Sequence, residues 1–181
     1  MSKIKSLLKS YKHRIQTPWQ KNISPEQRAI FCIYNENDER ALRIQIDEFR
    51  YATECASHPW LLFDLTDTFA EWLCKDKYAE EIFKDTDELK IQPFYLDYLK
   101  ENFSRFIEEN KAGEDHVIAV NGVASLFSLL KVKQVVMEFA PLVKGRLLVF
   151  FPGRYGDNNY RLLDSYDGWG YLAIPITGDT N

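Results

Sequence analysis

Short, uninterrupted apolar segments alternate along this chain with longer segments of helical periodicity. The apolar segments are rich in the β-branched and aromatic residues that strands favour, and they span residues 28–34, 60–65, 117–120, 146–151 and 171–176. Between them, apolar side chains recur at steps of three and four residues, which is typical of amphipathic helices. Fully apolar strands that alternate with helices form mostly parallel sheets with helices on both faces. We therefore expect a three-layer α/β fold, similar in layout to P-loop and Rossmann proteins, with about five strands, the last one at an edge because it contains Pro175.

The N-terminal segment differs in composition from the rest of the chain. Residues 1–21 contain six Lys and Arg residues and no acidic residue, although the net charge of the whole chain is −4. Apolar residues recur there at helical spacing and predict a basic amphipathic helix ended by Pro18: Ile4, Leu7, Leu8, Tyr11 and Ile15. We expect residues 1–24 to form this helix and a linker, and residues 25–181 to form a single α/β domain.

Three uses of this helix are open from the sequence. It docks on its own domain, it packs on a partner protein through side chains such as Leu7 and Tyr11, or its basic face contacts nucleic acid or a membrane. The acidic body of the protein disfavours direct DNA binding. No apolar run approaches the roughly 20 residues of a membrane span, and lysines interrupt the N-terminus where a signal peptide would have its apolar core. We expect a cytoplasmic protein.

The loop after the first strand lacks the residues that hold a nucleotide phosphate. It reads Asn35-Glu36-Asn37-Asp38, whereas a phosphate-binding loop needs glycines whose backbone N–H groups converge and a lysine at the helix start. Neither the P-loop motif nor the dinucleotide-binding glycine motif occurs in the chain. We expect this loop to cap the following helix through Asn37 or Asp38 and to bind no nucleotide cofactor.

Any site is expected beyond the carboxyl ends of the strands, where ligands bind in open parallel sheets. That edge collects four loops, at residues 35–38, 64–67, 121–125 and 152–161. Three carboxylates there are candidates for a divalent metal site in a nucleotide hydrolase or nuclease, and helix capping is the competing interpretation: Asp38, Asp64 and Asp67. No histidine falls in a pattern with a nucleophile. The favoured expectation is therefore a protein without catalytic residues, metal or cofactor.

The segment from Pro152 to Arg161 is the strongest candidate for a contact with another protein. It combines arginine, tyrosine and short polar side chains: Arg154, Tyr155, Asp157, Asn158, Tyr160 and Arg161. Arginine and tyrosine anchor many protein interfaces, and a long loop in a compact domain is often functional. A surface turn set by Gly153 and Gly156 is the alternative interpretation.

Several segments, taken in order, resemble the BrxB-type family of BREX phage-defence islands. The third expected strand ends in Asn121-Gly122 and continues into Val-Ala-Ser-Leu-Phe127, and the fourth runs into Phe-Pro-Gly-Arg-Tyr155. The segments 35–40 and 62–65 also fit the pattern, and the resemblance covers residues 25–176. The tail at residues 166–171 departs from the tyrosine- and arginine-rich ending typical of the family.

The resemblance implies a small, non-enzymatic component of a bacterial anti-phage system. In such islands the family accompanies a DNA methyltransferase, a large ATPase and an alkaline-phosphatase-like protein of the PglZ type, which is the expected direct partner. The family has no established catalytic residues to transfer to this chain. Self-association, the metal-dependent enzyme and the DNA-binding accessory protein stay open as alternatives.

Overall fold

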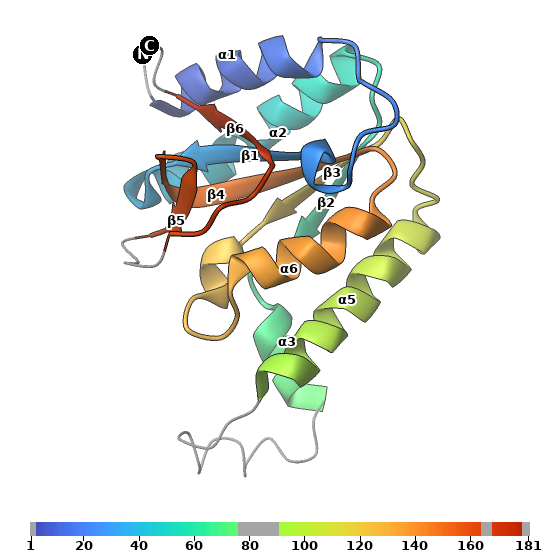
Figure 1. The fold of residues 1–181 in the computed structure, drawn as a ribbon, viewed down its shortest axis with the longest axis vertical. Coiled ribbons are helices and arrows are strands. Elements are labelled where there is room, and N and C mark those ends of the chain that lie inside the picture. Colours follow the sequence, from blue (N-terminus) through green and yellow to red (C-terminus); the bar gives the residue numbers. More distant parts are fainter. Residues whose placement is uncertain (1–2, 76–90, 164–167, 179–181) are drawn as a thin grey trace.

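The computed structural model describes residues 3–75, 91–163 and 168–178, and shows an α/β fold built around one sheet (Figure 1). The strand order is β2-β3-β4-β1-β6, all neighbours in this path are parallel, and β5 pairs with β4 in the antiparallel sense. The strands are β1 (Ala29–Tyr34), β2 (Trp60–Asp64), β3 (Val117–Asn121), β4 (Arg146–Gly156), β5 (Asn159–Leu162) and β6 (Ile174–Thr177). The helices are α1 (Lys3–Ile15), α2 (Glu39–Cys55), α3 (Thr68–Lys75), α5 (Ile91–Glu109) and α6 (Val132–Phe139).

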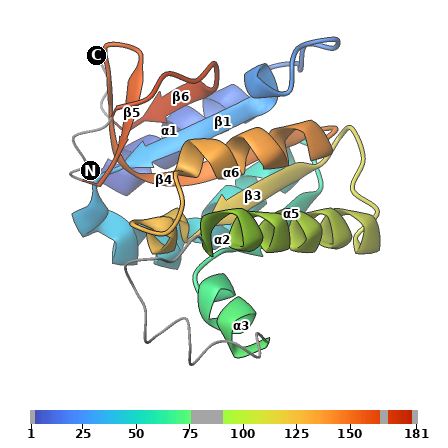
Figure 2. The same ribbon diagram turned by 60° about the horizontal axis from the view of Figure 1, so that its bottom comes forward.

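The expected fold class is confirmed, because a mostly parallel sheet lies between two layers of helices (Figures 1 and 2). Every residue of β1 and β3 is buried, as is expected of strands that are apolar on both faces. Pro175 lies in β6, whose place at one end of the strand order confirms the predicted edge position.

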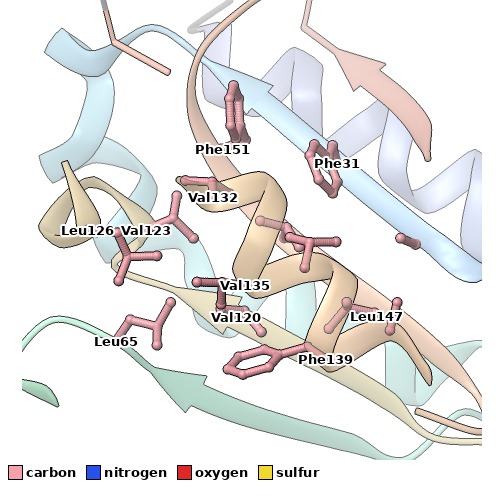
Figure 3. Close-up of a cluster of buried hydrophobic side chains, with 14 of the residues drawn as sticks. Phe31, Leu65, Val120, Val123, Leu126, Val132, Val135, Phe139, Leu147 and Phe151 are labelled. Carbon is pink, nitrogen blue, oxygen red and sulfur yellow. The ribbon is translucent and has the colours of Figure 1, made fainter. Parts of the chain in front are cut away.

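Each face of the sheet has its own apolar core. On one face, α5 and α6 pack over the sheet, and Phe103 of α5 stacks on Phe139 of α6 with ring centroids 3.9 Å apart. Figure 3 shows Val135 of α6 next to Val120 of β3. On the other face, α1 and α2 cover a second core. The helix layers therefore fix the sheet from both sides.

The N-terminal helix docks on its own domain. Leu7 and Tyr11 are 1% and 0% exposed in the core that α1 shares with α2 and the sheet. The hydroxyl of Tyr11 lies 2.6 Å from Oγ1 of Thr53, and its ring lies 5.2 Å from that of Phe49. The expectation that Leu7 and Tyr11 form a surface for a partner is therefore corrected, because both side chains complete the protein's own core.

The fourth strand is longer than the sequence predicts. The apolar run predicts a strand that ends at Phe151 and is followed by a loop over residues 152–161, but β4 continues to Gly156 and returns as β5. Close pairing requires glycine here, because a Cβ on Gly153 would lie 2.0 Å from the carbonyl oxygen of Arg161. The turn falls at Asp157 and Asn158, whose φ angles of 50° and 58° suit a tight two-residue hairpin.

The strand order creates a crevice between β1 and β4. From β1 the chain crosses to β2 at one edge of the sheet, whereas from β4 it leads through β5 to β6 at the other edge. Adjacent parallel strands whose connections diverge in this way leave an opening outside their carboxyl ends. The same edge carries the ends of β2 and β3, so loops from four strands meet there.

Among the described residues, no helix combines the length and the apolar character needed to cross a membrane.

Candidate functional site

Asparagine, not aspartate, shapes the loop after β1. The side chain of Asn35 accepts a hydrogen bond of 3.0 Å from the backbone N–H of Asn37, which forms a short turn before α2. Asp38 occupies the cap position of α2, but its side chain makes no capping hydrogen bond. The expected caps, Asn37 and Asp38, are thus corrected to Asn35, whose side chain precedes a single 3₁₀ turn at residues 36–38.

The first turn of α2 carries a charged pair that reaches back to β1. Nε of Arg43 lies 2.7 Å from Oε1 of Glu39, and the hydroxyl of Tyr34 donates to the other oxygen of Glu39. The hydrogen bond to Glu39 raises the pKa of Arg43, and burial, followed by the bond to Glu39, raises the pKa of Tyr34. Tyr34 is therefore a neutral hydroxyl donor at physiological pH, and it ties the end of β1 to α2.

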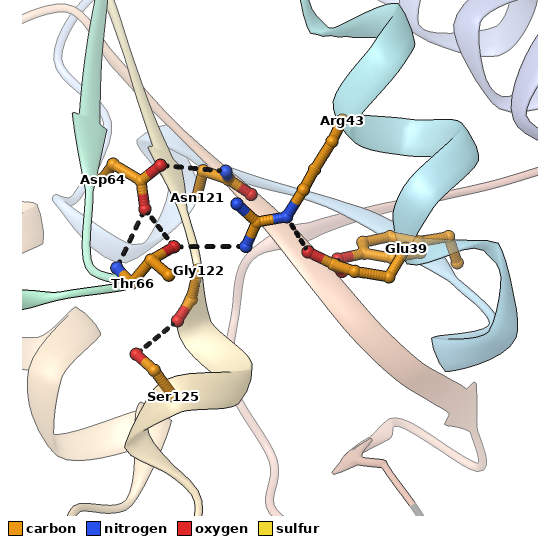
Figure 4. A network of polar contacts seen from close by, with 8 residues as sticks. Glu39, Arg43, Asp64, Thr66, Asn121, Gly122 and Ser125 are labelled. Carbon is orange, nitrogen blue, oxygen red and sulfur yellow. Dashed lines mark hydrogen bonds and ion pairs between the residues drawn. The ribbon is translucent and has the colours of Figure 1, made fainter.

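A polar network continues from Arg43 across the ends of β2 and β3 (Figure 4). Arg43 donates to the hydroxyl of Thr66 over 3.1 Å, and the backbone N–H of Thr66 donates to Asp64 over 2.8 Å. The second oxygen of Asp64 accepts a hydrogen bond of 3.3 Å from the side-chain amide of Asn121. Asn121 is only 2% exposed, and its own amide oxygen has no hydrogen-bond partner. The network thus stabilises the loops after β2 and β3 against α2.

The carboxylates at this edge do not assemble a metal site. In the parts of the chain that the structure describes, no three His, Cys, Asp or Glu side chains come together in a way that could hold a metal ion. Asp64 is bonded to Thr66 and Asn121, while Asp67 accepts the N–H of Glu71 through its backbone carbonyl. The cluster of Asp38, Asp64 and Asp67 that a metal-dependent hydrolase or nuclease would require is absent from these residues.

We predict that Asp64 acts through its hydrogen bonds and not through its charge. Asp64→Ala leaves the buried amide of Asn121 without its acceptor and should lower the free energy of unfolding by about 1–3 kcal/mol. Asp64→Asn keeps one oxygen for Thr66, and the amide of Asn121 can turn its unpaired oxygen towards the new NH₂ group. The loss should then stay below about 1 kcal/mol. Urea denaturation measures the free energy of unfolding of both Asp64 variants, with replacement of the exposed Asp67 by alanine as the control. Equal losses of stability in Asp64→Ala and Asp64→Asn would contradict the role of Asp64 as a hydrogen-bond acceptor.

The β4–β5 hairpin presents a pair of arginines. Arg154 and Arg161 lie directly opposite each other, and both are exposed. The neighbouring pair is Tyr155 and Tyr160, and Tyr160 is fully buried with its hydroxyl donating to the carbonyl oxygen of Ala173 over 2.9 Å. Because side chains alternate along a strand, the arginines face away from the core that Tyr160 fills.

The structure thus separates the predicted contact residues of this segment. Tyr160 holds the hairpin on the domain, and its expected role as a partner contact is corrected because no surface of it is exposed. Asp157 and Asn158 form the exposed turn, where Asn158 accepts a hydrogen bond from the hydroxyl of Tyr155 over 3.0 Å. Arg154 and Arg161 are the accessible charged pair.

A cavity of about 330 Å³ lies in the crevice between β1, β4 and β6. Tyr34 and Asn35 contribute the end of β1, Arg154 and Tyr155 contribute the hairpin, and Lys3 comes from α1. Leu7, although nearly inaccessible, forms part of the cavity wall. Two segments that the sequence offered as separate contact surfaces, the basic helix and the segment 152–161, therefore meet around one hollow.

No pattern in the sequence predicts that Lys3 and Arg154 line the same cavity. The two belong to opposite ends of the chain, and only the pairing of β6 with β1 carries the C-terminal segment back to α1. Gly178 makes the approach close, because a Cβ there would lie 2.6 Å from the carbonyl oxygen of Lys3. Figure 1 accordingly shows β6 alongside α1.

Comparison with protein-family models, with curated proteins and with solved structures finds no match for this chain. The fold class is therefore defined by the strand order and the helix layers, and the candidate site by the geometry of the carboxyl edge.

Proposed function

We propose that the protein is a non-catalytic, protein-binding component of a BREX-type anti-phage defence system in the bacterial cytoplasm. Its direct partner in this proposal is the PglZ-type, alkaline-phosphatase-like protein. The order of the segments 35–40, 62–65, 117–127 and 148–155, which resembles the BrxB-type family, supports the defence context. The cavity and the hairpin at the carboxyl edge support a binding role.

The observation that carries the binding role is the exposed pair of Arg154 and Arg161. Like charges placed directly opposite on two strands destabilise a sheet. Carboxylates of a partner at this position would accept the charge-assisted, bidentate hydrogen bonds that arginine forms well. Lys3 at the adjacent cavity adds a third positive charge to the same surface. The chemistry of the edge therefore fits an acidic segment of a partner, with one of its side chains seated in the cavity.

Reversal of both arginine charges is the direct test. We expect Arg154→Glu with Arg161→Glu to weaken binding of the PglZ-type partner by at least about tenfold, because attraction across the interface becomes repulsion. The two proteins are expressed together, purified, and their affinity is measured by calorimetry. Both side chains are exposed and lie outside the apolar cores, so the variant should fold as the wild type does.

The matched control carries the same change in net charge at a different place. Arg50→Glu with Arg105→Glu alters exposed arginines of α2 and α5, far in sequence from the hairpin, and should leave the affinity unchanged. An equal loss of affinity in the control would exclude the hairpin as the contact. If the wild-type proteins do not associate at micromolar concentration, the proposed partnership itself is wrong.

A further inference from the structure

A second set of unusual side chains lies at the opposite edge of the sheet, where the strands begin. Arg146 is the first residue of β4 and is only 7% exposed. Its guanidinium donates to the backbone carbonyl oxygens of Gly145 and Gln20, each over 3.2 Å. The cation also lies 4.5 Å from the ring centroid of Trp19, and Trp19 itself stacks on His58 with ring centroids 3.7 Å apart. Arg146 is thus a buried cation held by carbonyl dipoles and an aromatic ring.

Two further arginines, Arg14 and Arg28, lie close enough to Arg146 to act on its charge. Burial lowers the pKa of Arg146, and the nearby positive charges of Arg14 and Arg28 lower it further. Within residues 3–75, 91–163 and 168–178, none of these three arginines forms an ion pair. Arg28 donates to the carbonyl oxygen of Lys144 over 3.1 Å, and its buried Nε has no hydrogen-bond partner. Glu26 acts electrostatically on Arg28. Buried cations in proteins are normally ion-paired, whereas Arg146, the most buried of the three, forms no ion pair with the described residues.

Beside this cluster lies a cavity of about 310 Å³. Arg14, Trp19 and Arg146 line one part of it, and Ile30 and Ile174, at the starts of β1 and β6, line another. Leu172 lines the cavity as well and is 71% exposed, which is unusual for a leucine. Glu114 and Asp115 line a neighbouring cavity. Among the described residues, they are the only carboxylates that line either of the two cavities. The first cavity, here called the arginine pocket, therefore combines two cations with an apolar wall.

We propose that the arginine pocket binds a small molecule that carries a phosphate group and has an organic body of about mononucleotide size. A phosphate supplies the missing negative charge and accepts the paired hydrogen bonds that guanidinium groups donate. The apolar wall suits the body of the ligand, and the volume falls within the lower range of small-molecule sites. The pocket lies at the edge of the sheet opposite to the cavity beside Arg154, and the inference is independent of the proposed docking role.

Binding of adenosine monophosphate to the purified full-length protein tests this site. Calorimetry is expected to show saturable binding to one site, and tryptophan fluorescence should change because Trp19 lines the pocket. Arg14→Gln should weaken binding by at least about tenfold, the effect of losing one charge-assisted hydrogen bond. Arg14 is exposed and has no hydrogen bond or ion pair from its side chain in the described residues, so its replacement should leave the thermal midpoint unchanged.

The control is Arg105→Gln, an exposed arginine of α5 on the other face of the sheet, which should bind as tightly as the wild type. Inorganic phosphate is titrated in parallel and should bind at least about tenfold more weakly, because it makes no apolar contacts. Equal affinity for the two probes would overturn the assignment of the apolar wall to the ligand's body. Absence of saturable binding of both probes at millimolar concentration, or wild-type affinity in Arg14→Gln, would overturn the site.

Discussion

Deletion of residues 1–16 is expected to leave a chain that no longer folds. This segment contains the whole of α1, whose five core side chains are nearly inaccessible to solvent: Ile4, Leu7, Leu8, Tyr11 and Ile15. Burial of one such side chain contributes about 1.5–3 kcal/mol, so their loss removes about 8–15 kcal/mol, as much as the whole stability of a typical domain. Circular dichroism and thermal unfolding should show no cooperative transition.

A surface change on the same helix provides the control for this deletion. Lys9 is exposed on the basic face of α1, and Lys9→Gln should alter the free energy of unfolding by less than about 0.5 kcal/mol. A truncated chain that unfolds cooperatively near the wild-type midpoint would show that α1 is an accessory element. In that case the buried contact between Tyr11 and Thr53 would have to contribute little to stability.

On the face of the sheet that α5 and α6 cover, Phe103→Ala is expected to lower stability more than any other single substitution. Phe103 is fully buried, stacks on Phe139 at 3.9 Å with an interplanar angle of 6°, and meets the edge of Phe63 at 5.1 Å. Truncation leaves a cavity between α5, α6 and β2, and we expect the free energy of unfolding to fall by about 3–5 kcal/mol.

The matched control is an exposed phenylalanine on the same helix. Phe94 is on the same helix but 68% exposed, so Phe94→Ala should change stability by less than about 0.5 kcal/mol. Urea denaturation of the two variants measures the difference. Similar losses in both would contradict the assignment of Phe103 to the core and of Phe94 to the surface.

The sequence predicts the helix and sheet layers of this fold, but it does not predict the order of the strands within the sheet. Apolar runs such as 146–151 identify buried strands because a strand that is covered on both faces needs apolar side chains at every position. The order of strands depends on which connections cross the sheet, and local patterns carry no information about that. The hairpin was missed for a local reason: its turn residues, Asp157 and Asn158, adopt positive φ angles without the glycine that usually marks such turns.

The structure brings the predicted loops together at the carboxyl edge of the sheet, and it exposes only some of the predicted contact residues. Arg154 and Arg161 are exposed as a contact role requires, whereas Tyr160 and Tyr11 belong to the interior. An amphipathic pattern shows that a face will be buried and does not show against what, so the docking of α1 was left undecided. Arg146 had no signal at all, because a charged residue at the start of a strand is ordinarily solvated.

The position of β1 between β4 and β6, inside the sheet, has a consequence for biosynthesis. β1 is the first of the described strands to leave the ribosome, yet its partners in β4 and β6 are made much later. Phe31 pairs with Val149, which is 118 residues downstream (149 less 31), and Ile30 pairs with Ile174, which is 144 residues downstream (174 less 30). Pairing over such separations forms late, and contacts of this kind slow folding. The nascent chain therefore carries an unpaired, wholly apolar strand until β4 and β6 have been made, which predicts a need for chaperone protection during translation.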